Sequence, residues 1–217
     1  ANEEQKIEYK TIIGDSYHII VGKKGLKNQR NFIQDYFPAN SLIVQMDDDL
    51  KEIYQLVMKK NSNKYKQKDM KPITNLKKFI ENAFQYTIQQ GYYLWGVYPI
   101  DNAYFMSNKT THDLRLIVGP FWGYINRHNN RLKNTINEKE DIERTIKYYI
   151  KDGGVVRFNN ISIQTSYYKT PGGMGTLKNR VENATKSVEF LVNKYPKYCK
   201  ANLNKESGMP DIKLIKQ

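Results

Sequence analysis

The feature that most constrains the fold is a short apolar run that ends in three consecutive aspartates. Residues 41–46 (SLIVQM) have the length and apolar content of a buried strand, and Asp47, Asp48 and Asp49 follow directly. Like charges a few ångströms apart repel, so three carboxylates at the end of a buried strand are costly unless a cation lies among them. The run therefore predicts a sheet with a ligand at the carboxyl end of this strand.

A hard divalent cation, Mg²⁺ or Mn²⁺, is the natural partner of this cluster, with Asp47 and Asp49 as the expected metal ligands. Such ions prefer oxygen ligands and join one or two carboxylates to substrate phosphates, so the cluster also predicts a diphosphate. The alternative is that Asp49 caps a helix that begins at Leu50, where acidic neighbours are favoured by the helix dipole. The strand that leads directly into the aspartates favours the metal site.

The rest of the chain alternates strand-like and helix-like segments, which predicts an α/β domain. Apolar residues at helical spacing predict helices over residues 26–37, 50–57, 72–90, 140–151 and 177–192. Short β-favouring runs predict strands at residues 17–21, 41–46, 93–98, 103–106, 114–118, 121–125, 155–158 and 161–165. Short connections join the first strand, the first helix and the second strand, so these two strands are expected to be parallel neighbours. The glycine-rich segment 171–175 is interpreted as an ordinary tight turn.

Composition narrows the class of protein. No apolar run approaches the roughly 18 to 20 residues of a membrane helix, and the first residues lack a signal-peptide pattern, so we expect a soluble protein with no membrane partner. The single cysteine, Cys199, excludes an internal disulfide and fits a reducing compartment: cytoplasm, nucleus or virus factory. The formal charge of +13 attracts polyanions such as nucleic acid, although scattered lysines also decorate solvated faces.

Several segments together resemble the TET/JBP-associated glycosyltransferases, relatives of the base J glucosyltransferase found in viruses, phages and eukaryotes. The segment GLKNQRNFIQDYFPANSLIVQMDDDL resembles the GT-A pattern, in which a glycine and an Arg-Asn pair precede a strand that ends in a DxD motif. Further similar segments are GVYPIDNAYFM, DLRLIVGPFWGYINR, EDIERTIKYYIKDGGVVRFNN and YYKTPGGMG. The resemblance covers nearly all of the chain, from about Ile19 to the last helix.

The resemblance implies a GT-A-like (Rossmann-like) mixed sheet flanked by helices, in a single domain over residues 1–217 with 1–16 and 200–217 peripheral. It implies a UDP-sugar donor, Mn²⁺ or Mg²⁺, and transfer of the sugar to a hydroxymethylated pyrimidine in DNA. GT-A enzymes begin with a strand-helix-strand unit that binds the nucleotide base, but only a short stretch precedes residue 17. This unit is therefore expected to be missing at the N-terminus or to be supplied by another chain.

Five residues outside the aspartate cluster are candidates for the site. Arg30, of the Arg-Asn pair, is expected to reach a carboxylate or the diphosphate, with Lys27 as a second cation; the alternative is an exposed helix arginine. Glu140 and Asp141 resemble the acidic pair that many inverting GT-A enzymes place under the acceptor hydroxyl, which makes Asp141 the expected general base. Acidic residues are, however, favoured in any first helical turn. Asp101 is the competing base, and its alternative is an Asx turn.

Two other functions stay open at this point. One is a glycosyltransferase that acts on protein or glycan, and the other is a non-catalytic module of the same fold that binds nucleic acid or a protein partner. The three histidines lack the i,i+4 spacing or the cysteine partner of a zinc site, so zinc is not expected.

Overall fold

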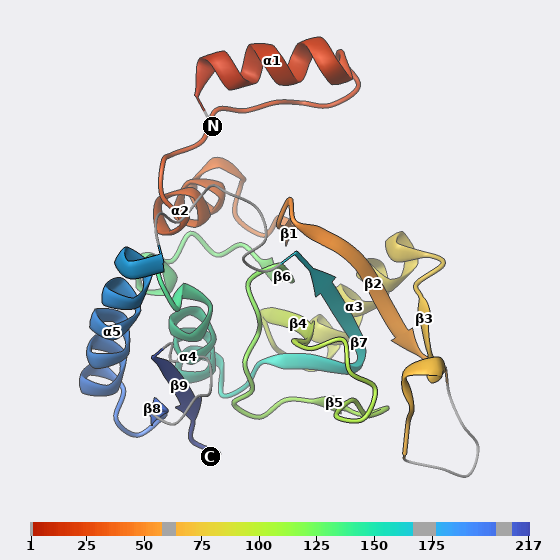
Figure 1. Ribbon diagram of the computed structural model, residues 1–217, viewed down its shortest axis with the longest axis vertical. Helices are drawn as coiled ribbons and strands as arrows, with labels where there is room; N and C mark the ends of the chain where they lie inside the picture. The colour runs from red at the N-terminus through yellow and green to blue at the C-terminus, as the bar shows by residue number, and fades with distance from the viewer. Residues whose placement is uncertain (1, 58–63, 167–176, 203–209) are drawn as a thin grey trace.

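A curled mixed sheet flanked by helices forms the centre of the α/β domain in a computed structural model (Figure 1). The structure describes residues 2–57, 64–166, 177–202 and 210–217, with only the backbone of 177–180. The strands of the main sheet are β1 (Leu42–Met46), β2 (Leu50–Leu56), β3 (Met70–Pro72), β4 (Leu94–Tyr98), β5 (Thr110–Thr111), β6 (Phe121–Ile125) and β7 (Val156–Thr165). The helices are α1 (Glu3–Ile13), α2 (Leu26–Tyr36), α3 (Leu76–Gln89), α4 (Glu140–Asp152) and α5 (Leu177–Lys194), with 3-10 turns η1 (Gln67–Asp69) and η2 (Asn130–Leu132). A separate hairpin consists of β8 (Cys199–Asn202) and β9 (Asp211–Leu214).

The strand order β1-β6-β4-β7-β2-β3 brings the carboxyl ends of three strands to one edge of the sheet. Both β1 and β4 run antiparallel to β6, and β4 runs parallel to β7, so β1, β4 and β7 all point the same way. Open α/β sheets bind ligands at the carboxyl ends of their strands. This edge of the sheet is therefore the expected position of a ligand site.

Strand β1 lies at the end of the sheet and has β6 as its only partner strand among the described residues. Ser41 accepts a hydrogen bond from the Asn126 N–H at 2.9 Å, and the Asp47 N–H donates to the Pro120 carbonyl at 3.0 Å. Because backbone groups alternate in direction along an antiparallel ladder, those of residues 42, 44 and 46 point away from β6. The free edge of β1 therefore carries hydrogen-bonding groups that no described strand uses.

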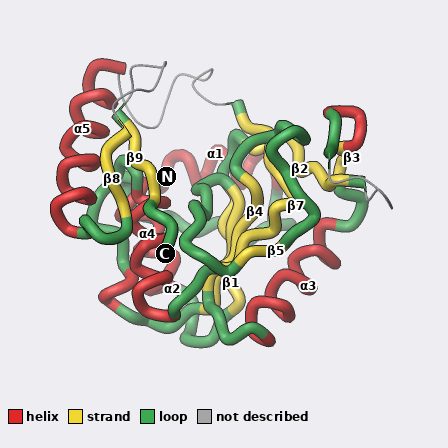
Figure 2. Tube along the Cα trace, turned by 90° about the horizontal axis from the view of Figure 1, so that it is seen from below, coloured by secondary structure: helices red, strands yellow, loops and turns green. Residues whose placement is uncertain are grey.

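Helices cover both faces of the sheet. Helix α3 packs on one face, where Phe84 joins a cluster with Trp95 and Phe121. Helices α2 and α4 cover the other face, around Trp122 and Tyr148. Helix α5 and the β8–β9 hairpin form a further layer outside α4, on the side away from α3 (Figure 2). Helix α1 stands apart from this body in Figure 1 and has no buried residue.

Seven predicted elements are present, namely α2, α3, α4, α5, β1, β4 and β6. The predicted strand at residues 17–21 is wrong, because residues 14–25 form no helix or strand and only connect α1 to α2. Its predicted parallel pairing with β1 is wrong for the same reason. A five-residue apolar run cannot form a strand unless another strand offers it hydrogen bonds, and the described neighbour of β1 is β6. The N-terminal helix α1 was not predicted, although a capping box between Asn2 and Gln5 starts it.

The predicted helix at residues 50–57 is also wrong, since this segment is strand β2, paired with β7 on one side and β3 on the other. Apolar spacing over so few residues fits either period, and pairing with two strands decides it. Asp49 consequently caps no helix. Pro72 ends β3 instead of opening a helix, and α3 begins at Leu76, where the Asn75 side chain caps it by accepting the Lys78 N–H at 2.9 Å.

Three other strand predictions differ from the structure. Residues 103–106 form turns, closed by bonds from the Phe105 and Met106 N–H groups. Residues 114–118 are in no ladder, because side chains of α4 bond their backbone: Thr145 accepts the Ile117 N–H at 3.1 Å, and Arg144 donates to the Ile117 carbonyl at 3.0 Å. The runs 155–158 and 161–165 belong to one strand, β7. The predicted turn at 171–175 lies outside the described residues. None of the described helices is long and apolar enough to cross a membrane.

Candidate functional site

The three aspartates form the connection between β1 and β2 at the carboxyl edge of the parallel strands. The Asp47 N–H donates to Pro120 at 3.0 Å, next to the start of β6, and the Leu50 N–H donates to the Asp47 carbonyl at 3.3 Å. The Asp49 carbonyl accepts the Ser166 N–H at 3.1 Å, at the end of β7. The aspartate turn, residues 47–49, therefore passes from the β6 side of the sheet to the β7 side.

The aspartate turn holds more negative charge than the described cations balance. Burial raises the pKa of Asp49, and the nearby Asp47 and Asp48 carboxylates raise it further. Asp47 forms an ion pair with Arg30 at 2.6 Å, whereas neither Asp48 nor Asp49 has an ion-pair partner in the part of the chain that the structure describes. This local excess of negative charge would be relieved by a bound cation.

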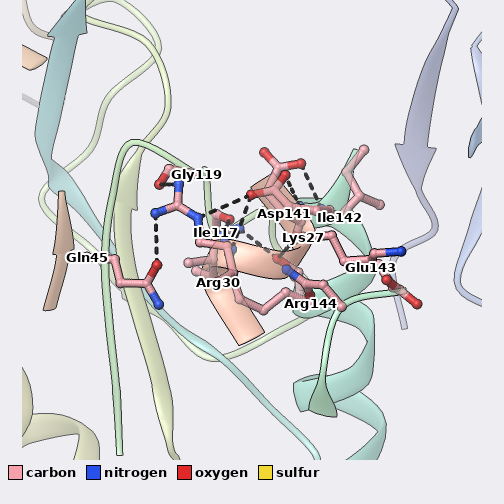
Figure 3. A network of polar contacts seen from close by, with 12 residues as sticks. Lys27, Arg30, Gln45, Ile117, Gly119, Asp141, Ile142, Glu143 and Arg144 are labelled. Carbon is pink, nitrogen blue, oxygen red and sulfur yellow. Dashed lines mark hydrogen bonds and ion pairs between the residues drawn. The ribbon is translucent and has the colours of Figure 1, made fainter. Parts of the chain in front are cut away.

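Arg30 connects α2 to the aspartate turn (Figure 3). Its side chain is only 7% exposed, which rules out the alternative of an exposed helix arginine. The guanidinium donates to Asp47 Oδ1 at 2.6 Å, to Gln45 Oε1 at 2.8 Å and to the Gly119 carbonyl at 3.2 Å. A planar group with several fixed donors suits this role, because one side chain can bond the strand, the turn and the loop before β6 at once.

Glu140, the first residue of α4, lies within ion-pair distance of Arg30. Its Oε1 is 3.8 Å from Arg30 Nε and 3.5 Å from an Arg144 nitrogen, and its Oε2 accepts the Asp141 N–H at 2.6 Å. The carboxyl is 5% exposed. Burial, and secondly the Asp141 carboxylate, raise its pKa to about 7, and the two arginines offset only part of this effect. A carboxyl with a pKa near neutrality thus lies in contact with the arginine that binds Asp47.

Arg144 and Gln45 complete this network and were not predicted as site residues. Arg144 is buried, its guanidinium lies 3.7 Å from the centre of the Trp122 ring, and burial lowers its pKa. The signal for Arg144 was its i,i+4 spacing from Glu140. The signal for Gln45 was a lone amide inside an apolar strand, since buried polar groups are normally hydrogen-bonded.

Asp141 is partly exposed at the second position of α4. Its Oδ1 accepts the Ile142 N–H at 2.9 Å. It lies beside Gly119, where an added Cβ would be 4.0 Å from the Asp141 Cβ and 3.4 Å from Glu140 Oε1. The loop before β6 thus lies against the acidic pair at ordinary contact distances.

Asp101 has no bond to the network around Arg30 among the described residues, whereas Lys27 is drawn beside that network in Figure 3. Asp101 lies in the loop after β4, and its Oδ2 accepts a bond from Gln164 of β7 at 3.0 Å. The Asx turn of this loop is made by Asn102, whose side chain accepts the Tyr104 N–H at 3.0 Å. Lys27 is bonded through its backbone N–H to Asn137 at 3.1 Å, and its ammonium group has no ion-pair partner among the described residues.

The ligands of a metal at the aspartate turn would have to come partly from a substrate. Among the described residues, no group of three or more histidine, cysteine, aspartate and glutamate side chains is arranged to hold a metal ion. Two carboxylates with substrate phosphates and water are, however, sufficient for Mg²⁺. The turn fits such a shared site better than a closed structural one.

Comparisons of the chain with protein-family models, with curated proteins and with solved structures give no match.

Proposed function

We propose that this protein is a metal-dependent glycosyltransferase of the GT-A type, which transfers a sugar from a UDP-sugar to a hydroxymethylated pyrimidine in DNA. The observation that carries the proposal is the buried Arg30, which bonds Asp47 through one nitrogen and lies within ion-pair distance of Glu140 through another. Two acidic motifs about 90 residues apart, both selected by their sequence pattern, thus meet around one guanidinium at the carboxyl edge of the sheet.

Asp47 and Asp49 would hold Mn²⁺ or Mg²⁺, and Asp48 lies between them. The unbalanced charge of the aspartate turn and the raised pKa of Asp49 support a cation here. When bound, the ion would neutralise the diphosphate and stabilise it as the leaving group. Arg30 would orient Asp47, and Lys27 would approach the diphosphate from α2.

Asp141 would take the proton of the acceptor hydroxyl as that oxygen attacks the anomeric carbon. Asp141 is partly exposed whereas Glu140 is buried, which supports Asp141 as the carboxylate that an acceptor reaches. Asp101 stays the competing base. A target base would have to leave the duplex stack, because its hydroxymethyl group must reach the sugar.

The free edge of β1 supports a partner strand from another chain. Leu42 and Met46 are 54% and 47% exposed there, and an apolar hollow of about 520 Å³ lies between β1 and α3. An added strand would use the outward backbone groups of β1 and cover these side chains. This geometry also fits the second candidate function, a non-catalytic module completed by a partner.

The metal is tested by calorimetry of UDP with and without Mn²⁺. We expect Mn²⁺ to tighten UDP binding, and Asp47→Asn or Asp49→Asn to remove that gain. Asp15→Asn, at a side chain 97% exposed, is the matched control and should keep it. If UDP binding does not depend on metal in any of these proteins, the proposed metal site is wrong.

The acceptor is tested by incubating the protein with a UDP-sugar, Mn²⁺ and either hydroxymethylated or unmodified DNA. Sugar transfer only to hydroxymethylated DNA supports the proposal, and transfer to protein or glycan favours the other transferase. DNA binding should also weaken steeply between low and physiological salt, because released counterions drive it. Salt-dependent DNA binding without transfer or UDP hydrolysis would favour the non-catalytic module.

A further inference from the structure

A second hollow, lined by both charged and apolar side chains, lies near the start of β7, whereas the aspartate turn lies near its end. It has a volume of about 370 Å³ and lies between the loop after β5, the start of β7 and strand β9. Arg157, in its wall, is eight residues before Thr165, the end of β7 near the turn. The hollow is thus set off from the aspartate turn along β7, although Ile142 in its wall directly follows Asp141, the proposed base.

Four cationic residues line this hollow, which we call the basic hollow: Arg115, Arg157, Lys213 and Lys216. Among the described residues of its lining, Asp113 is the only acidic one. The Asp113 carboxylate is already engaged, because Arg115 Nε donates to both of its oxygens at 2.9 and 3.0 Å. Three cationic residues are therefore left without a paired carboxylate among the described residues.

Arg157 is the buried member of this group, with 8% of its surface exposed. Its Nε donates to Asn159 at 2.8 Å, and its guanidinium lies 5.1 Å from the centre of the Tyr98 ring. No described carboxylate lies within ion-pair distance of it. Burial, and secondly the nearby Arg115, lower its pKa to about 10. The terminal nitrogens of Arg157 are not fully buried, so they are open to the hollow and can donate to an oxyanion there.

We propose that the basic hollow binds a phosphate group, with the Arg157 guanidinium as its central donor and Lys213 and Lys216 as flanking cations. A guanidinium can donate two parallel bonds to phosphate oxygens, and lysines add charge without fixed geometry. The remaining wall is apolar, with Leu114, Leu116, Ile142 and Ile212, and would contact the organic part of the ligand. The ligand is thus an organic phosphate, and the class we test is a phosphorylated nucleotide, either free or within a polynucleotide. This site does not depend on the proposed transferase activity.

The test is calorimetry with thymidine, thymidine 5′-monophosphate and a short single-stranded oligothymidylate. We expect the phosphorylated ligands to bind and thymidine not to bind. Lys213→Gln/Lys216→Gln should weaken binding at least about tenfold, because two charge-assisted contacts are lost. The control Lys77→Gln/Lys78→Gln removes the same charge from the exposed face of α3 and should change affinity less than twofold.

Arg157→Lys keeps the charge and loses the planar donor pair, so it should also weaken binding about tenfold. Because Arg157 is buried, the thermal unfolding of this variant is measured as well. If the variant is unfolded, the test depends on the exposed lysine pair alone. Binding of the oligonucleotide alone would assign the phosphate to a polynucleotide backbone. No binding of either phosphorylated ligand, or equal losses in the two lysine pairs, would overturn the proposal. Asp47→Asn should leave this binding unchanged, which separates it from the proposed transfer site.

Discussion

The raised pKa of Glu140 leads to a prediction about how stability depends on pH. A carboxyl with a pKa of about 7 in the folded protein, against an ordinary 4.5, binds more protons in the folded than in the unfolded chain between these values. The free energy of unfolding must then fall as pH rises through this window. Between pH 5 and pH 8 the linkage relation gives a fall of about 2 to 3 kcal/mol from this one group.

The perturbation that isolates this effect is Glu140→Gln, because glutamine keeps the shape of the side chain and does not titrate. At pH 5 the folded wild type already carries a largely protonated, neutral Glu140, so the variant loses no ion pair there. Relative to wild type, the variant should gain about 2 to 3 kcal/mol on going from pH 5 to pH 8. Other titrating groups are common to both proteins and cancel in the difference.

Urea unfolding of wild type and variant at pH 5 and pH 8, followed by circular dichroism, measures this difference. Glu81→Gln is the matched control, since Glu81 is on the exposed face of α3 in a surface pair with Lys77, and such pairs contribute little. If the difference between Glu140→Gln and wild type is the same at both pH values, Glu140 titrates as an ordinary carboxyl. Burial would then not raise the pKa of Glu140.

Three other changes test other parts of the structure. In a transfer assay, Asp141→Asn should lower turnover by on the order of a hundredfold while UDP affinity stays nearly constant. Asp101→Asn should lower turnover less. If Asp101→Asn has the larger effect, the roles of the two residues are exchanged. Gly123→Ala should lower the free energy of unfolding by about 1 to 3 kcal/mol, because the added Cβ would lie 2.4 Å from the buried Trp95 ring. An unchanged melting curve would contradict this packing. In the isolated chain, the amides of residues 42, 44 and 46 point away from β6 and should exchange hydrogen faster than the β1 amides that are bonded to β6. Equal protection of both sets would mean that another segment already covers this edge of β1.

Local signals were sufficient where one face of an element meets the core. Helices α3 and α4 repeat apolar residues over several turns, and β4 and β6 are dominated by buried residues, so their patterns predicted them. Segments 17–21 and 50–57 were misassigned because each is short and its conformation depends on its neighbours. The second became a strand when β7 and β3 supplied hydrogen bonds on both sides, and the first found no strand to pair with.

The candidate site was predictable residue by residue but not as a network. The aspartate turn and Arg30 were marked by their positions around a strand, and Glu140 and Asp141 by the start of a helix. Their connection depends on how α2 and α4 lie against the same face of the sheet, which neither local pattern contains. Gly119 shows the same limit, since its carbonyl accepts a bond from Arg30, which is distant in the sequence.

The shared position of Arg30 has a consequence for how the site would respond to a metal. Arg30 bonds Asp47 at 2.6 Å but stands 3.8 Å from Glu140, so most of its charge is now directed to the aspartate turn. If Mn²⁺ binds Asp47 as proposed, it competes with Arg30 for that carboxylate. The guanidinium would then be free to move toward Glu140, and a closer cation would favour the ionised form of that buried acid. Metal binding would in this way lower the pKa of Glu140, and by linkage the metal would bind more tightly at higher pH. The two acidic motifs would thus be coupled through one arginine, without any movement of the sheet that holds them.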